Sequence, residues 1–198
     1  PSAPVALSRE GGDLSSRVAD NLFWLGRYVE RAEALARLLR GVTGKITEQA
    51  AATGAPEWFV LLRTLTEQTQ AYPGFVRAGS ERRLRAPEDE IRSLIFDAQR
   101  TGTLAHTLTA LQRVAGTVRD RLSTDMWRVL NAAASGHSPA VVDQWPLTWT
   151  LELINRTVMN LASFAGLAAE SMTRGQGWRF LDMGRKLERS VQILTLLQ

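Results

Sequence analysis

Apolar residues recur every three or four positions along the N-terminal part of the chain. From Asp13 or Ser15 to about Arg40 this spacing is unbroken, as in the core-facing stripe of an amphipathic helix. The stripe comprises Leu14, Val18, Leu22, Leu25, Val29, Ala32, Ala36 and Leu39. Asp13 or Ser15 is a suitable N-cap, and Gly41 is predicted to end the helix. At 1.5 Å per residue, such a helix spans about 40 Å.

The same helical spacing returns in most of the remaining chain. We predict helices over residues 44–52, 57–71, 87–100, 103–122, 124–134, 142–172 and 178–198, with a polar loop over 77–85. Trp145 and Trp149, near the start of the longest of these, are predicted to be core residues, with a partner interface as the alternative. No stretch alternates apolar and polar residues over the length of a strand. The pattern therefore predicts an all-α bundle of about six to eight helices.

The first and last long helices share a motif. A shift of 158 residues along the chain aligns two hexapeptides with the common pattern Gly-Arg-x-x-Glu-Arg, and it also keeps the apolar positions in register. The hexapeptides are Gly26-Arg27-Tyr28-Val29-Glu30-Arg31 and Gly184-Arg185-Lys186-Leu187-Glu188-Arg189. We interpret the two helices as a pseudo-repeat, whose members can pair about a pseudo-twofold axis.

The motif charges are predicted to be partly buried. Trp24, Tyr28, Leu35 and Leu38 form a second apolar stripe, so the first helix is apolar over most of its circumference and is expected inside the bundle. A buried charge needs a partner because its desolvation is costly.

Two interpretations of these charges remain open. In the first, Arg27, Glu30, Arg31, Arg185, Glu188 and Arg189 form structural ion pairs. Gly26 and Gly184 then let the two helices approach closely. In the second, four arginines face only two glutamates, so the surplus holds an anionic peptide carboxylate or phosphate unless acids such as Glu170 make up the difference. The chain would then be a substrate-holding or catalytic domain.

The amino-acid composition excludes several kinds of catalytic and metal-binding site. The chain has 198 residues with 44% hydrophobic content, which is typical of one globular domain. It has no Cys, which excludes disulfides, thiolate zinc sites and cysteine nucleophiles. Its two histidines lack the Glu-x-x-His spacing of carboxylate-bridged metal bundles, because residues 103 and 134 are Thr and Ala. We therefore predict no metal and no cofactor.

Net charge and short motifs argue against other classes of protein. The net charge is only +4, although 22 of the 24 basic residues are Arg. The basic cluster at residues 82–85 is followed at once by three acids, so nucleic-acid binding is an unlikely function. The run Gly136-His137-Ser138-Pro139-Ala140 lacks the last glycine of a nucleophile elbow and reads as a turn.

Residues 1–13 read as a linker, and residues 14–198 as one helical domain. No apolar run reaches 18 residues, and the N-terminus lacks the pattern of a signal peptide. We therefore expect a cytoplasmic protein with no membrane span. The last eight residues stop inside an apolar helical pattern, so the domain is expected to be truncated at the C-terminus.

Three blocks of sequence resemble the Alpha-E family, a bacterial helical domain named for a Glu-Arg motif. The blocks are residues 14–33, 118–131 and 170–189, and the motif positions are Glu30-Arg31 and Glu188-Arg189. Members of this family are associated, often in one polypeptide, with circularly permuted ATP-grasp proteins. The resemblance implies an ATP-grasp amide or peptide ligase as partner, with fusion at the N-terminus as one arrangement and with the ATP chemistry in that partner. It implies no catalytic role for the helical domain itself.

Overall fold

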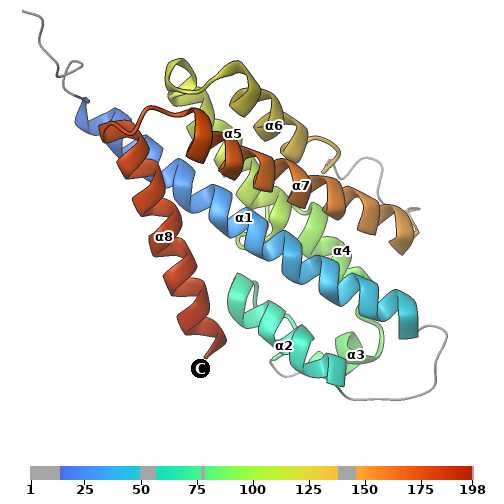
Figure 1. Ribbon diagram of the computed structural model, residues 1–198. Coiled ribbons are helices and arrows are strands. Elements are labelled where there is room, and N and C mark those ends of the chain that lie inside the picture. Colours follow the sequence, from blue (N-terminus) through green and yellow to red (C-terminus); the bar gives the residue numbers. More distant parts are fainter. Residues whose placement is uncertain (1–13, 50–56, 77–78, 138–145, 198) are drawn as a thin grey trace, which may run out of the picture.

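The computed structural model describes residues 14–49, 57–76, 79–137 and 146–197. In these residues the chain forms eight α-helices and one 3-10 turn and no strand, which confirms the all-α prediction (Figure 1). The helices are α1 (Ser16–Gln49), α2 (Glu57–Thr69), α3 (Ser80–Arg85), α4 (Glu88–Phe96), α5 (Leu104–Thr117), α6 (Thr124–Ala134), α7 (Leu147–Ser171) and α8 (Gln176–Leu196), with the 3-10 turn η1 (Arg119–Arg121) between α5 and α6. The predicted linker, residues 1–13, lies outside the described residues.

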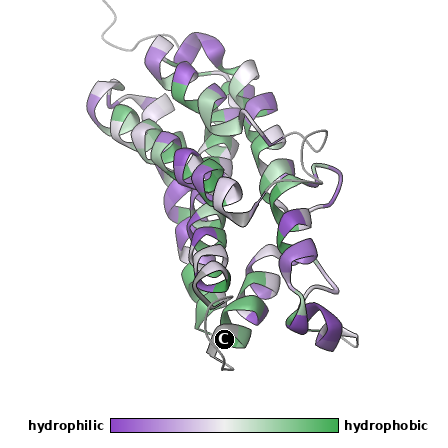
Figure 2. Cartoon of the chain, turned by 90° about the vertical axis from the view of Figure 1, so that its right-hand side faces the viewer, coloured by the Kyte–Doolittle hydropathy of each residue, from purple (hydrophilic) through white to green (hydrophobic). Residues whose placement is uncertain are grey.

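Helix α1 is the central element of the bundle. It packs against α8, α5, α7, α2 and α4, so it is surrounded on several sides (Figure 1). Six of the eight predicted stripe residues are fully enclosed, whereas Leu14 and Val18 are half-buried at the start of the helix. Helices α2 and α4 to α8 bury apolar residues in the core, whereas α3 has no buried residue. Hydrophobic and hydrophilic segments both occur along the ribbon (Figure 2).

The prediction that Gly41 ends the first helix is wrong. Helix α1 continues through Gly41 and Gly44 as far as Gln49, so residues 44–49 of the predicted separate helix over 44–52 belong to α1, and residues 50–52 lie outside the described residues. Val42 and Ile46 extend the buried stripe beyond Leu39. Each glycine costs about 1 kcal/mol inside a helix, and burying a Val or Ile side chain contributes about 1.5–3 kcal/mol. Tertiary packing therefore outweighs the local signal.

Several other boundaries also differ from the predictions. Residues 80–85 form the short helix α3, not a loop. Helix α4 ends at Phe96 because the Asp97 carboxylate accepts hydrogen bonds from the N–H groups of Gln99 and Arg100, which closes a turn. Helix α5 ends five residues early, and η1 fills the interval before α6.

At the last two helices, α8 begins two residues earlier than predicted. Residues 142–145 of the predicted long helix lie outside the described residues, as does Trp145. The prediction of a core Trp149 is wrong, since this side chain is 61% exposed.

Candidate functional site: the α1–α8 crossing

Helices α1 and α8 cross at their two motif glycines. A Cβ atom added to Gly26 would lie within 3.0 Å of the backbone oxygen of Leu181, and one added to Gly184 equally close to that of Phe23. The shift of 158 residues that aligns the motifs also aligns Phe23 with Leu181. The two backbones therefore touch through equivalent atoms, as expected for a pseudo-twofold pair.

The carboxylate of Glu188 binds two arginines of α1. Arg27 donates from Nε to Oε2 at 2.7 Å. Arg31 donates from Nε to Oε1 at 2.6 Å and from Nη2 to Oε2 at 2.9 Å. Glu188 is only 3% exposed. Its ionised oxygens thus receive three charge-assisted hydrogen bonds in place of water.

The carboxylate of Glu30 makes the reciprocal contacts with α8. Arg189 donates from Nε to Oε1 at 2.5 Å, and Nη2 of Arg185 lies 3.3 Å from Oε2. Glu30 is 6% exposed. Each motif glutamate is therefore held between the two motif arginines of the other helix.

The pKa values follow from this arrangement. Burial opposes ionisation of Glu188, but the hydrogen bonds and charges of Arg31 and Arg27 outweigh it and lower its pKa below the ordinary 4.5. The hydrogen bond from Arg189 to Glu30 raises the pKa of that guanidinium, with help from the charges of Glu33 and Asp182. Both shifts favour the charged forms of Glu188 and Arg189.

Two aromatic rings support the α1 arginines. The guanidinium of Arg27 lies 5.1 Å from the centroid of the Trp24 ring, and that of Arg31 lies 5.7 Å from the Tyr28 ring. The rings of Trp24 and Tyr28 are 5.7 Å apart. Such cation–π contacts hold a guanidinium plane in one orientation.

Of the predicted site residues, the structure brings together the six motif charges, both motif glycines and Trp24. It does not bring Glu170 to them. That residue is exposed near the C-terminal end of α7, and the ion pairs of the crossing do not include it. Glu33 and Asp182 are the acids that lie near the crossing, where they pair with Arg37 and Lys186 in their own helices.

A cleft of about 830 Å³ opens beside the crossing. Its walls come from α1, from α8, from the end of α2 and from the start of α5. Residues of the crossing that line it are Trp24, Arg27, Tyr28, Arg31, Glu188 and Arg189. Leu35 and Leu38, the rest of the second apolar stripe, line it as well.

Sequence reasoning missed the opposite wall of this cleft. Gln68, Gln70, Thr101 and His106 lie there, and they come from segments that are remote from both motifs in the sequence. Gly102 brings the segments together because a Cβ at this position would meet the backbone oxygen of Thr69. A glycine at position 102 indicates a turn, and its φ of +88° agrees with this. The glycine does not indicate which helix the turn packs against.

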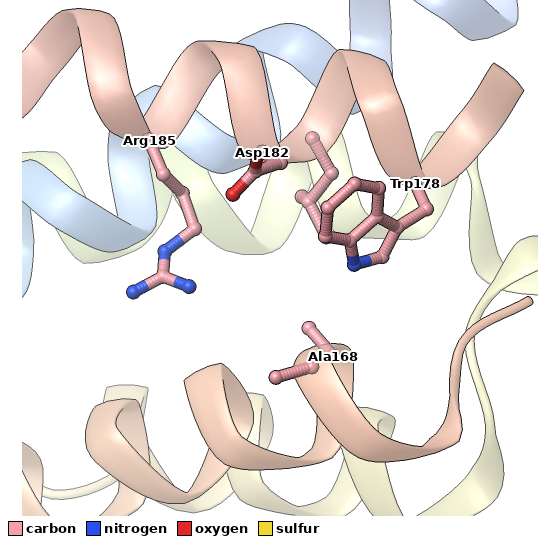
Figure 3. Close-up of a pocket in the computed structure, with 6 residues that line it drawn as sticks. Ala168, Trp178, Asp182 and Arg185 are labelled. Atoms are coloured by element: carbon pink, nitrogen blue, oxygen red, sulfur yellow. The ribbon is translucent and has the colours of Figure 1, made fainter. Parts of the chain in front are cut away.

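The fourth motif arginine faces a different space. Arg185 lines a cavity of about 30 Å³ between α8 and α7, together with Trp178, Asp182 and Ala168 (Figure 3). A cavity of this size has room for about one or two water molecules. It is therefore no candidate for a ligand site.

The described residues contain no group of three or more His, Asp or Glu side chains that could hold a metal ion. His106 lies on α5, where Nδ1 is 3.1 Å from the backbone oxygen of Ala98. His137 is buried beside α7, with Nε2 3.4 Å from Oγ1 of Thr157. Ser138, Pro139 and Ala140 of the predicted turn lie outside the described residues.

His137 predicts a pH dependence of stability. Burial, helped by the charge of Arg156, lowers its pKa from 6.5 to about 4. Between these values the unfolded chain binds a proton that the folded chain does not. The free energy of unfolding is therefore largest above pH 6.5 and falls by about 3 kcal/mol as the pH drops to 4.

Chemical denaturation at several pH values between 7 and 4 measures this loss. In His137→Phe the slope over this window should largely disappear. Parallel curves for the wild type and the variant would contradict the assignment.

Across the described residues, no helix combines the length and the apolarity needed to cross a membrane.

The fold and the crossing define an all-helical domain built on a symmetric pair of Glu-Arg helices. Residues 14–198 match the model of the Alpha-E family, described as a predicted alpha-helical domain with a conserved ER motif. The chain therefore belongs to the Alpha-E family. Its Glu30-Arg31 and Glu188-Arg189 pairs both lie in the crossing.

The chain is also similar to three curated mycobacterial proteins, all called uncharacterized. These are Mb2597 of Mycobacterium bovis and MT2643 and Rv2567 of two strains of Mycobacterium tuberculosis. Each is 30% identical over 93% of this chain, which spans only 22% of the relative's length. No solved structure matches the chain.

Proposed function

We propose that this chain is a non-catalytic helical partner domain that docks on an ATP-grasp amide or peptide ligase. The observation that carries the proposal is that each motif arginine has a carboxylate partner across the crossing. Motif arginines that are paired with glutamates of the other helix hold α1 and α8 together. The association with ATP-grasp ligases rests on the family resemblance, and the longer relatives have room for further domains.

An apolar stripe on α8 supplies the docking surface. The stripe consists of Met183, Leu187 and Leu194 together with Leu197, which directly follows the helix, and all four are exposed. Their spacing places them on one face of α8, away from the glycine and glutamate that contact α1. Exposed apolar patches of this kind mark protein interfaces. The occupant we propose is the ligase.

Binding of the purified chain to the ATP-grasp protein of the same genome tests the proposal. In Leu187→Lys/Leu194→Lys the affinity should fall at least about tenfold, because each replaced side chain removes roughly 1 kcal/mol of interface burial. The fold should survive, since both positions are exposed. Met159→Lys is the matched control, since Met159 is 67% exposed but lies on α7.

Three results would contradict the proposal. The first is a ligase that does not bind the wild-type chain. The second is a stripe buried between two copies of the chain, which light scattering would show as a dimer that the double variant breaks. The third is amide product made from ATP and amino acids by the chain alone.

A further inference from the structure

Three of the four motif arginines face the large cleft. Arg27, Arg31 and Arg189 all line it, whereas Arg185 is turned toward the small cavity against α7. The carboxylates on the cleft wall are Glu188, which is nearly closed off, and Glu67, which accepts a hydrogen bond from the Tyr72 hydroxyl. Arg189 also pairs with Glu30, which does not line the cleft, so each of the three guanidinium groups keeps a carboxylate partner of the crossing.

These guanidinium groups keep unused donors. Arg27 and Arg189 bind their glutamates through Nε, and Arg31 through Nε and Nη2. No described residue accepts a hydrogen bond from the Nη groups of Arg27 and Arg189 or from Nη1 of Arg31. The ion pairs fix the inner edge of each guanidinium and leave its outer edge free, which suits planar recognition of an oxyanion.

The remainder of the cleft is suited to the nonpolar part of a small organic ligand. Trp24 and Tyr28 lie beneath the two α1 arginines, and Leu35 and Leu38 continue this apolar wall along α1. Gln70 provides a polar group on the wall formed by the end of α2, where the Gln68 amide donates from Nε2 to the backbone oxygen of Gln192 at 3.0 Å. The volume of about 830 Å³ lies within the range of about 300–1,000 Å³ that small-molecule sites occupy.

We infer that this cleft binds a small organic anion. Its carboxylate or phosphate oxygens accept hydrogen bonds from Arg27, Arg31 and Arg189, and its aromatic or aliphatic body lies along Leu35 and Leu38. The inference goes beyond docking to a ligase and does not depend on it, because the apolar stripe of α8 lies outside the cleft.

Calorimetric titration with four probes tests the inference. The probes are 3-phenylpropionate, phenyl phosphate, inorganic phosphate and the uncharged 3-phenylpropanamide. We expect at least one of the two aromatic anions to bind at least about tenfold more tightly than the amide, since a hydrogen bond to a charged group contributes about 1.5–3 kcal/mol. The stronger of the two anions identifies the oxyanion. Inorganic phosphate should bind more weakly than phenyl phosphate because it has no apolar body.

Two variants distinguish a loss of anion binding from a loss of folding. Arg189→Gln removes one guanidinium whose side chain is 58% exposed, while Glu30 keeps Arg185. It should weaken anion binding about tenfold. Ala34→Phe adds a large side chain to the cleft wall without changing any charge, and should abolish binding. Circular dichroism confirms that each variant is folded.

Arg37→Gln is the matched control. Arg37 lies on the same helix as Arg31, but its partner is Glu33 and it does not line the cleft. Anion binding should therefore be unchanged in this variant. The inference is overturned if no anion binds at millimolar concentration, if the amide binds as tightly as the anions, or if folded Arg189→Gln and Ala34→Phe bind like the wild type.

Discussion

Gly26→Ala should lower the free energy of unfolding by about 3 kcal/mol, because the new methyl group has no space. The added Cβ would lie within 3.0 Å of the backbone oxygen of Leu181, and a backbone atom cannot swing aside as a side chain can. Either α1 and α8 separate or the helices bend, and overpacking of this kind costs about 1–3 kcal/mol or more. A melting temperature about 10 °C lower follows for a domain of this size.

Gly184→Ala should have an effect of the same size, because its Cβ would meet the equivalent oxygen of Phe23. The double variant should cost clearly less than the sum of the two single variants. Once the first methyl group has pushed the helices apart, the second meets less resistance. Strict additivity would show that the two contacts are independent and would contradict a shared crossing.

Gly41→Ala is the control on the same helix. A Cβ at Gly41 meets nothing within 4 Å. The substitution should stabilise the protein by about 0.5–1 kcal/mol, because alanine favours the helix and restricts the unfolded chain. One chemical change should therefore act with opposite signs at two places on α1. Thermal and urea unfolding of the three single variants measures these changes in stability. Equal effects at Gly26 and Gly41 would contradict a close helix contact at Gly26.

The repeated motif made the α1–α8 pairing predictable from the sequence. A glycine and a glutamate four residues apart lie on one side of a helix, so a close approach and a buried carboxylate could be expected together. That each glutamate would contact the arginines of the other helix, and not those of its own, could not be predicted. Arg27 and Arg31 are close neighbours of Glu30 in the sequence, yet in the structure they bind Glu188. The partner therefore depends on how the two helices lie relative to each other, which the sequence does not give.

The cleft could not be predicted for a related reason. Its arginine wall is local to the motifs, but its opposite wall depends on how the end of α2 packs on Gly102. The exposure of Trp149 illustrates the same limit. An aromatic residue at helical spacing fits a core face, and the packing of α7 alone determined that this ring lies outside.

Glu188→Gln should cost about 3 kcal/mol of stability, the usual result of removing one partner from a buried ion pair. The substitution keeps the size of the side chain but neutralises a carboxylate that is 3% exposed and binds Arg27 and Arg31. The amide also turns an N–H group toward one of these donors. Two guanidinium groups then share a single neutral acceptor.

Acid should reveal the same interaction. The pKa of Glu188 is lower in the folded protein than in the unfolded chain, so its contribution is complete above about pH 4.5 and is lost as the pH falls through the lowered pKa. Glu188→Gln removes this part of the acid sensitivity. Urea unfolding at pH 7 and at pH 3.5 should therefore show a smaller difference for the variant than for the wild type.

Asp125→Asn provides the comparison for a surface pair. Asp125 lies 3.6 Å from Arg128 on α6, and both side chains are well exposed, so this substitution should change stability by no more than about 1 kcal/mol. If Glu188→Gln were equally mild, the carboxylate would not hold the helix pair together, and the proposal of a scaffold stabilised by its Glu-Arg pairs would fail. A large loss at Glu188 with little change at Asp125 places the stabilising charge at the crossing.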